Sequence, residues 1–182
     1  MTCDDPDLHW GAMSALDPVQ SPVLVGRDEY LDLADRRLAD AAAGHGHVLL
    51  FAGEAGVGKT RLMRSIRRRA VAAGFRHAGG DLSPADHDVP LAVFGDLART
   101  MLEMPDLASL GDALLARCAQ TRTDVVYSRT LVLDVVGMID RSIDAPTLLS
   151  FEDLQWADDL SLEAIAELAR VADRRPLIVV GS

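Results

Sequence analysis

The chain has 182 residues, 49% of them hydrophobic and 25% charged, which fits one globular domain better than two. Its 28 acidic and 18 basic residues give a formal net charge of −10, which argues against a general polyanion-binding surface. Two distant cysteines (Cys3 and Cys118), an acidic N-terminus and the lack of an apolar run of ~20 residues argue against a disulfide scaffold, a secretory signal and a membrane span, so we expect a cytoplasmic protein.

Two segments precede the glycine-rich part of the chain. Residues 1–20 contain prolines and a glycine without a sustained hydrophobic period, and we expect a flexible leader followed by one domain over residues 21–182. In that domain a helix is predicted from Asp28, as its N-cap, to about Ala43, with Gly44 as its stop. One face of this helix carries Leu31, Ala34 and Leu38.

A strand, a loop and a helix then follow one another. The apolar run Val48–Ala52 predicts a buried strand, and the next eight residues match G-x-x-x-x-G-K-[ST] without a mismatch. These eight are Gly53, Glu54, Ala55, Gly56, Val57, Gly58, Lys59 and Thr60. A helix is predicted from about Lys59 through Ile66. The alternative, a glycine-rich turn with a chance lysine, is disfavoured because the motif and its context agree.

The motif has the chemistry of a phosphate site. Its glycines let main-chain N–H groups approach an anion closely, and the helix N-terminus adds roughly half a positive charge. Lys59 supplies a cation for β- and γ-phosphates, and Thr60 offers a hydroxyl to Mg²⁺. The helix goes on with Arg61, Arg64, Arg67, Arg68 and Arg69. Because the net charge is −10, we expect these arginines to form a solvated face rather than a nucleic-acid or partner surface.

The middle of the chain is predicted to be mostly helical. After Gly74, residues 75–79 predict a second strand. Asp88 as N-cap and an early proline predict a helix whose buried stripe extends to Leu102. Further helices are predicted through Leu107–Cys118 and from about Asp124 to Arg141. The latter carries apolar residues on more than one side, Leu133 among them, and is expected to be sandwiched.

The last third of the chain predicts a second polar site. An apolar strand over 147–152 ends at Glu152 and Asp153, and carboxylates at the C-terminal end of such a strand can hold Mg²⁺ and orient a water. Asp158 and Asp159 are assigned to the N-terminus of the next helix. Its inward residues are expected to be Leu162, Ile165, Ala166 and Ala169. With a fourth strand over 176–181, the alternation predicts a parallel sheet covered by helices on both faces.

Four boxes of the sequence resemble one family. Leu24-Val-Gly-Arg-Asp-Glu29, the glycine-rich loop with Arg61-Leu62, Asp88–Phe94 and Phe151–Asp158 are similar to the ATPase module of STAND-type, AAA+-related proteins. The likeness is greatest to the module at the N-terminus of large ATP-binding regulators of the LuxR type, and it covers about residues 22–182.

The resemblance implies two cofactors, ATP and Mg²⁺, and a set of residues that bind them. Near the adenine and ribose it implies Val25, Gly26 and Arg27. Around the phosphates it implies Gly53 through Thr60 together with Arg61. For the metal and catalysis it implies Lys59, Thr60, Glu152 and Asp153, with Asp153 as the catalytic carboxylate. Which acid holds the metal stays open, because the family's usual order is Asp then Glu. Asp153 is one methylene shorter than that Glu, so we expect slow hydrolysis.

The fold that the resemblance implies is a three-layer α/β/α P-loop NTPase with a parallel sheet of strand order 5-1-4-3-2, truncated here after the fourth strand. The lid and effector domains are then expected in cis or from a partner protein. The family's helix-turn-helix lies outside these residues, so neither direct DNA binding nor membrane binding is expected, while a nucleotide-dependent oligomer is compatible with the family.

Three functions are therefore weighed. The leading one is an ATP-binding module that hydrolyses Mg-ATP slowly. The bound nucleotide, ATP or ADP, would then set a conformational switch in a signalling or transcription-regulating protein. The second is a nucleotide-holding interaction module without turnover. The third, a DNA-associated AAA+ ATPase of the origin-recognition type, is disfavoured by the net charge of −10.

Overall fold

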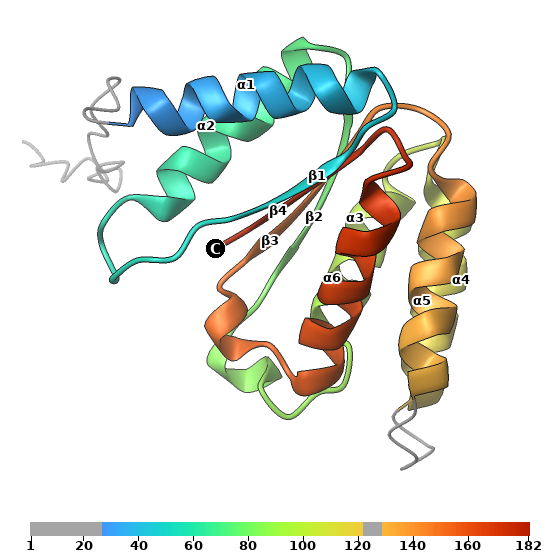
Figure 1. Cartoon of the computed structure of the whole chain (residues 1–182). Coiled ribbons are helices and arrows are strands. Elements are labelled where there is room, and N and C mark those ends of the chain that lie inside the picture. Colours follow the sequence, from blue (N-terminus) through green and yellow to red (C-terminus); the bar gives the residue numbers. More distant parts are fainter. Residues whose placement is uncertain (1–26, 122–128) are drawn as a thin grey trace, which may run out of the picture.

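The computed structural model describes residues 27–121 and 129–182, which form three layers with a parallel sheet in the middle (Figure 1). The strands are β1 (His47–Leu50), β2 (Arg76–Asp81), β3 (Thr147–Glu152) and β4 (Leu177–Gly181). They lie in the order β1-β4-β3-β2, and every neighbouring pair is parallel. The predicted α/β/α fold of the P-loop NTPase type is confirmed.

Helices α1 (Asp28–Ala42) and α2 (Lys59–Ala72) cover one face of the sheet. The other face carries α3 (Ala92–Leu102), α4 (Ala108–Thr121), α5 (Arg129–Ser142) and α6 (Asp159–Ala172) (Figure 1). Alternate residues of each inner strand serve the two cores. Leu148 and Ile178 pack with α1 and α2, while Leu149 and Val179 pack with the other helices. Both inner strands are buried on both faces, as expected for a parallel sheet.

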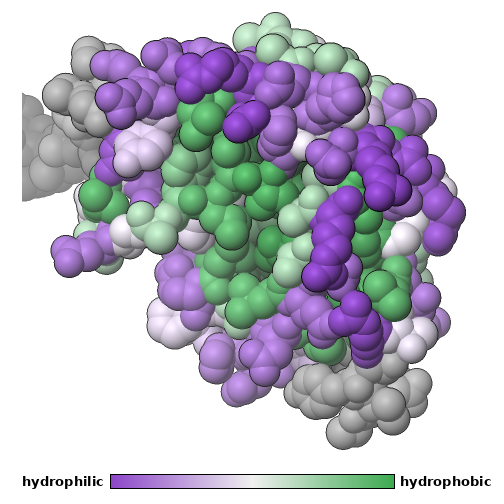
Figure 2. Space-filling view, in the orientation of Figure 1, coloured by the Kyte–Doolittle hydropathy of each residue, from purple (hydrophilic) through white to green (hydrophobic). Residues whose placement is uncertain are grey.

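Strand β1 differs from its prediction as a buried strand over Val48–Ala52. It ends at Leu50 and pairs, within the described residues, with β4 alone. As an edge strand it is only partly covered, and Leu50 is 62% exposed. Figure 2 shows hydrophobic residues gathered over the middle of this face, where β1 runs in Figure 1, with hydrophilic residues around them. The apolar run therefore lies at the edge of the sheet that the described residues form.

Several helix details also correct the predictions. Asp28 is the first helical residue of α1 rather than its N-cap, and the N-cap, Arg27, makes no side-chain cap bond. Asp88 does not cap α3, which begins only after Leu91. The chain first makes a short 3₁₀ turn, η1 (Pro84–Asp86), with a capping box between Ser83 and Asp86.

The apolar faces of the helices are confirmed only in part. Leu102 and Leu133 were expected to be buried, but they are 37% and 48% exposed. The side of α5 that carries Leu133 is therefore not covered by another element of the described residues. The inward face of α6 contains one of the four expected residues, Ile165. Its full set is Leu160, Ser161, Ala164, Ile165, Leu168 and Ala172. Within the described residues no helix has both the length and the apolar character to cross a membrane. The predicted leader (1–20), Val25, Gly26 and residues 124–128 lie outside the described residues.

Candidate functional site

The loop between β1 and α2 has the backbone that its glycines predict. Gly56 and Gly58 have φ angles of 80° and 92°, a region that side chains with a Cβ rarely adopt. Gly58 is the N-cap of α2, and no side chain caps this helix end. The first N–H groups of α2 therefore point towards the loop without a side-chain acceptor, which suits an anion.

Lys59, the first residue of α2, turns its side chain back over the loop. Its ammonium Nζ donates to the carbonyl oxygens of Gly53 at 2.8 Å and Glu54 at 3.2 Å. Both bonds are exposed to solvent. The cation thus lies directly above the loop backbone, where a bound anion would compete with these two carbonyls for it.

An open cavity of about 790 Å³ lies over this loop, within the ~300–1,000 Å³ range of small-molecule sites. The loop, α2, the turn after β3 and the end of β4 line it together. The lining residues are Gly53, Ala55, Gly56, Gly58, Lys59, Thr60, Arg61, Arg64, Asp153, Gln155 and Ser182. The predicted phosphate loop and the strand-end carboxylate Asp153, distant in sequence, therefore share one cavity.

Glu152 lies at the end of β3 against the start of α2. The hydroxyl of Thr60 donates a hydrogen bond to its carboxylate, and Asp81 is its neighbour across the β2–β3 pairing. Burial, followed by repulsion from Asp81, raises the pKa of Glu152, whereas the Thr60 bond and the cations Arg67 and Arg64 act in the opposite direction. The strand-end carboxylate and the loop threonine are thus brought together as predicted.

Asp153 occupies a different environment from Glu152. It is exposed and has a φ of 60°, a left-handed conformation that Asp adopts more readily than most residues. Its Oδ1 accepts a hydrogen bond from Nε2 of Gln155 at 2.9 Å, within the short 3₁₀ turn η2 (Leu154–Trp156). Asp153 thus lines the cavity, whereas Glu152 lies against Thr60 of α2.

The oxygen groups at this point suit magnesium. Thr60 and Glu152 offer a hydroxyl and a carboxylate, and Mg²⁺ prefers one or two such protein oxygens together with water and substrate phosphates. In the part of the chain that the structure describes, no group of three or more His, Cys, Asp or Glu side chains could hold a metal ion by itself. The donor set therefore fits a metal that arrives with a phosphate ligand better than a resident metal centre.

Arg27 is the one predicted adenine-side residue that the structure describes. Its guanidinium donates to the carbonyl oxygen of Val57 in the loop and lies over the Tyr30 ring, 5.8 Å from the ring centroid. Tyr30 in turn packs edge-on against Phe51, with ring centroids 6.2 Å apart. The start of α1 is thereby attached to the loop, next to the phosphate site.

Three cavity residues were not predicted as site residues: Arg64, Gln155 and Ser182. The arginines of α2 were expected to form a solvated face, and all but Arg61 are exposed. Within that face, Arg61 and Arg64 also line the open cavity, and Arg69 pairs with Asp35 of α1. A signal for Arg64 was present, since it follows Thr60 by four residues and lies on the same side of the helix. Ser182 is next to the cavity because β4 lies between β1 and β3, which strand order alone could have indicated.

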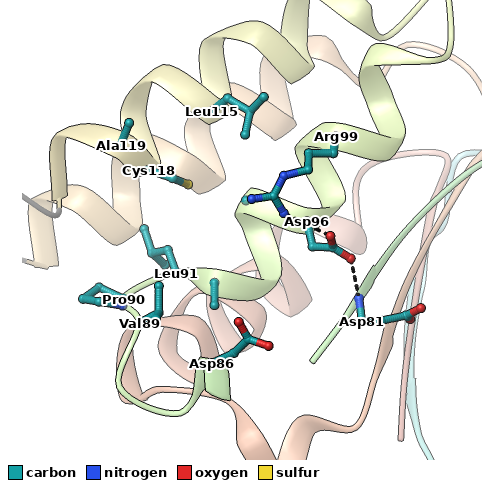
Figure 3. Close-up of a pocket in the computed structure, with 12 residues that line it drawn as sticks. Asp81, Asp86, Val89, Pro90, Leu91, Asp96, Arg99, Leu115, Cys118 and Ala119 are labelled. Carbon is teal, nitrogen blue, oxygen red and sulfur yellow. Dashed lines mark hydrogen bonds and ion pairs between the residues drawn. The ribbon is translucent and has the colours of Figure 1, made fainter. Parts of the chain in front are cut away.

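A second cavity, of about 230 Å³, lies between α3 and α4 (Figure 3). Leu115, Cys118 and Ala119 of α4 form its apolar wall, opposite Asp96 and Arg99 of α3. One of its acidic groups, Asp96, accepts a hydrogen bond from the backbone N–H of Asp81 at 2.9 Å and pairs with Arg99. This cavity includes none of the predicted site residues.

The comparison with protein families agrees with this geometry. The chain matches the family described as AAA ATPase domain over residues 23–180. An uncharacterised protein of Rhizobium meliloti (strain 1021), R02095, is 27% identical over 192 residues, which cover 86% of this chain and 18% of that protein. A structure of the ORC2 protein of Aeropyrum pernix, in ADPNP-ADP complexes, has a TM-score of 0.49 and 17% identity, covering 88% of this chain and 41% of that one.

The chain thus spans less than half the length of either of these two proteins. The family match has a different extent, since it covers residues 23–180 and so includes the described fold from α1 into β4. The phosphate loop, the strand-end carboxylates and the sheet order all lie inside it. The chain belongs to the AAA ATPase domain family and is a nucleotide-binding P-loop module of the AAA+ type.

Proposed function

We propose that this module binds Mg-ATP over the loop Gly53–Thr60 and hydrolyses it slowly. Whether ATP or ADP is bound then determines the conformation of a switch in a STAND-type signalling or transcription-regulating protein. The observation that carries the proposal is the hydrogen bond from Thr60 to Glu152 beside a cavity that also contains Lys59 and Asp153.

Each residue has a part that its chemistry allows. The N–H groups of the loop and of the α2 N-terminus bind phosphate oxygens, and Lys59 neutralises the β- and γ-phosphates. Thr60 and Glu152 would hold a magnesium ion, which would supply Lewis-acid stabilisation of the charge on the phosphates. Asp153, oriented by Gln155, accepts a hydrogen bond from the attacking water and draws its proton away.

Binding is tested by titrating a fluorescent ATP analogue with Mg²⁺ into the wild-type chain, Lys59→Ala and Arg68→Ala. Arg68 is a matched control, because it is an exposed cation of the same helix that does not line the cavity. We expect Lys59→Ala to weaken binding at least about tenfold, as loss of a charge-assisted bond costs ~1.5–3 kcal/mol. Equal affinity of wild type and Lys59→Ala would refute the assignment.

A nucleotide-holding module without turnover is the second candidate. It is favoured by Asp153, whose side chain is shorter than the glutamate usual at this position of the resembling family and reaches less far into the cavity. Phosphate release separates the two candidates. Turnover that Asp153→Asn abolishes while leaving binding intact supports the ATPase, whereas tight binding with no phosphate release in the wild type supports the holding module.

A further inference from the structure

Arg64 lies one helical turn after Thr60 on α2. Residues four apart in an α-helix lie on the same side, one above the other, so Arg64 extends the side of α2 that carries the Thr60 hydroxyl. Arg64 also lines the cavity that contains Lys59 and Thr60. Its place on the cavity wall follows from the helix geometry and is independent of the loop backbone.

A second observation places the charge of Arg64 near Glu152. Two arginines of α2, Arg64 and Arg67, favour the ionised form of the Glu152 carboxylate. Arg61 lines the cavity, but it is not among the groups that act on Glu152. Among the α2 arginines that the structure describes, Arg64 alone combines both properties. Arg64 therefore lines the nucleotide cavity and is also close enough to Glu152, the carboxylate that we assign to magnesium, for its charge to act there.

The γ-phosphate is the part of ATP that this arrangement favours. Lys59 and Thr60 serve the β- and γ-phosphates with the metal, and the γ-phosphate is the group that ADP lacks. A guanidinium offers a planar set of donors that matches phosphate oxygens, which an ammonium offers only as a point charge. A guanidinium on the cavity wall that also acts on Glu152 would thus add more to the binding of ATP than of ADP.

We infer that Arg64 is a specificity-determining cation, supplied in cis from the same helix as Lys59, that binds the γ-phosphate and makes the module prefer ATP to ADP. This inference rests on the proposed function, because it assumes that phosphates occupy the loop. It goes beyond that function by naming the side chain that distinguishes the two states of the switch.

The test compares the affinities of matched non-hydrolysable ATP and ADP analogues, with Mg²⁺, in the full chain. The variants are Arg64→Gln, Arg64→Lys and the control Arg68→Gln, whose exposed side chain contacts Ser65. We expect Arg64→Gln to weaken the ATP analogue about tenfold and the ADP analogue by less than about twofold, on the scale of one charge-assisted hydrogen bond. Arg64→Lys should restore part of the preference, and Arg68→Gln should keep all of it.

Two results would overturn the inference. In the first, Arg64→Gln keeps the wild-type preference for ATP. In the second, Arg64→Gln lowers the affinity for both analogues by the same factor. Lys59→Ala, measured alongside, distinguishes this failure from failure of the proposed function. If Lys59→Ala loses affinity for both analogues while Arg64→Gln keeps the wild-type ratio of ATP to ADP affinity, only the role of Arg64 is wrong. If Lys59→Ala binds both as the wild type does, the nucleotide site itself is wrong.

Discussion

The hydroxyl of Thr60 donates a hydrogen bond to the carboxylate of Glu152, joining the first turn of α2 to the C-terminal end of β3. Two predicted motifs distant in the sequence thus meet at one point. The contact is possible because β3 lies inside the sheet, where the even-numbered side chains of this strand face α2. A nucleotide on the loop would have its metal side at this contact.

Replacement of Thr60 by alanine is the first prediction. Thr60→Ala removes a hydrogen bond to a charged acceptor and a hydroxyl for magnesium, so we expect Mg²⁺-dependent binding of the ATP analogue to weaken about tenfold. Thr60→Ser keeps the hydroxyl and should stay within about threefold of wild type, well under the 1.4 kcal/mol of a tenfold change. Analogue titrations at fixed Mg²⁺ check this, and an equal loss in both variants would show that the hydroxyl is not responsible.

The second prediction concerns His77 and acid stability. His77 is half-buried, its Nε2 lies 2.9 Å from Oγ of Ser150, and burial followed by the charge of Arg67 lowers its pKa from 6.5 to about 4. The unfolded chain therefore binds this proton at a higher pH than the folded chain, and stability falls as the pH is lowered from 6.5 to about 4.

We expect His77→Gln, which can still bond to Ser150, to remove this part of the pH dependence. The difference should be about 1–2 kcal/mol between pH 7 and pH 4 after allowance for solvent screening. Urea denaturation of both chains at a series of pH values measures it. Parallel curves for wild type and His77→Gln would contradict the prediction.

Gly46, just before β1, supplies the third prediction. A Cβ at Gly46 would lie 2.0 Å from the carbonyl oxygen of Leu177 and 2.5 Å from that of Ala172, which are both backbone atoms. We expect Gly46→Ala to destabilise the fold by more than about 2 kcal/mol, because the backbone must move. The control is Gly95→Ala in α3, where a Cβ meets nothing within 4 Å and alanine favours the helix by ~0.5–1 kcal/mol. The midpoints of urea denaturation of the two variants measure this difference. Similar midpoints for Gly46→Ala and Gly95→Ala would be evidence against the close approach of the backbone at Gly46.

The cap of α6 supplies the fourth prediction. Oδ1 of Asp158 accepts from the backbone N–H groups of Leu160 and Ser161, both at 3.1 Å. Asp158→Ala should therefore cost about 1 kcal/mol of stability, whereas Asp159→Ala, which removes only a first-turn charge, should cost about half of that or less. Thermal unfolding of the two variants compares them, and a larger loss from Asp159→Ala would show that the cap had been wrongly assigned.

The sequence predicted the features that depend on local chemistry. Gly56 and Gly58 have the positive φ angles that the phosphate loop requires, and Asp158 caps α6 as the spacing indicated. The ends of the inner strands were also predictable, since apolar runs such as 147–152 stop at polar residues. These signals lie within a few residues of the element that they determine.

Features decided by tertiary contacts were not predictable in the same way. In α6 the alanines allow more than one apolar stripe, and packing exposes Leu162 while it buries Ser161, whose hydroxyl is satisfied by Asp158. The delayed start of α3 depends on Leu91, a bulky residue with a φ of 56°, which no propensity would place there. Arg64 is exposed and also lines the cavity, and its place at the cavity depended on where β3 ended relative to α2.

The most direct test of the shared site is the Mg²⁺ dependence of ATP-analogue affinity in wild type and in Glu152→Gln, which keeps the shape of the side chain without its charge. We expect Mg²⁺ to strengthen binding in the wild type at least about tenfold and to have little effect in Glu152→Gln, because the metal loses its carboxylate. The same Mg²⁺ enhancement in both chains would contradict it.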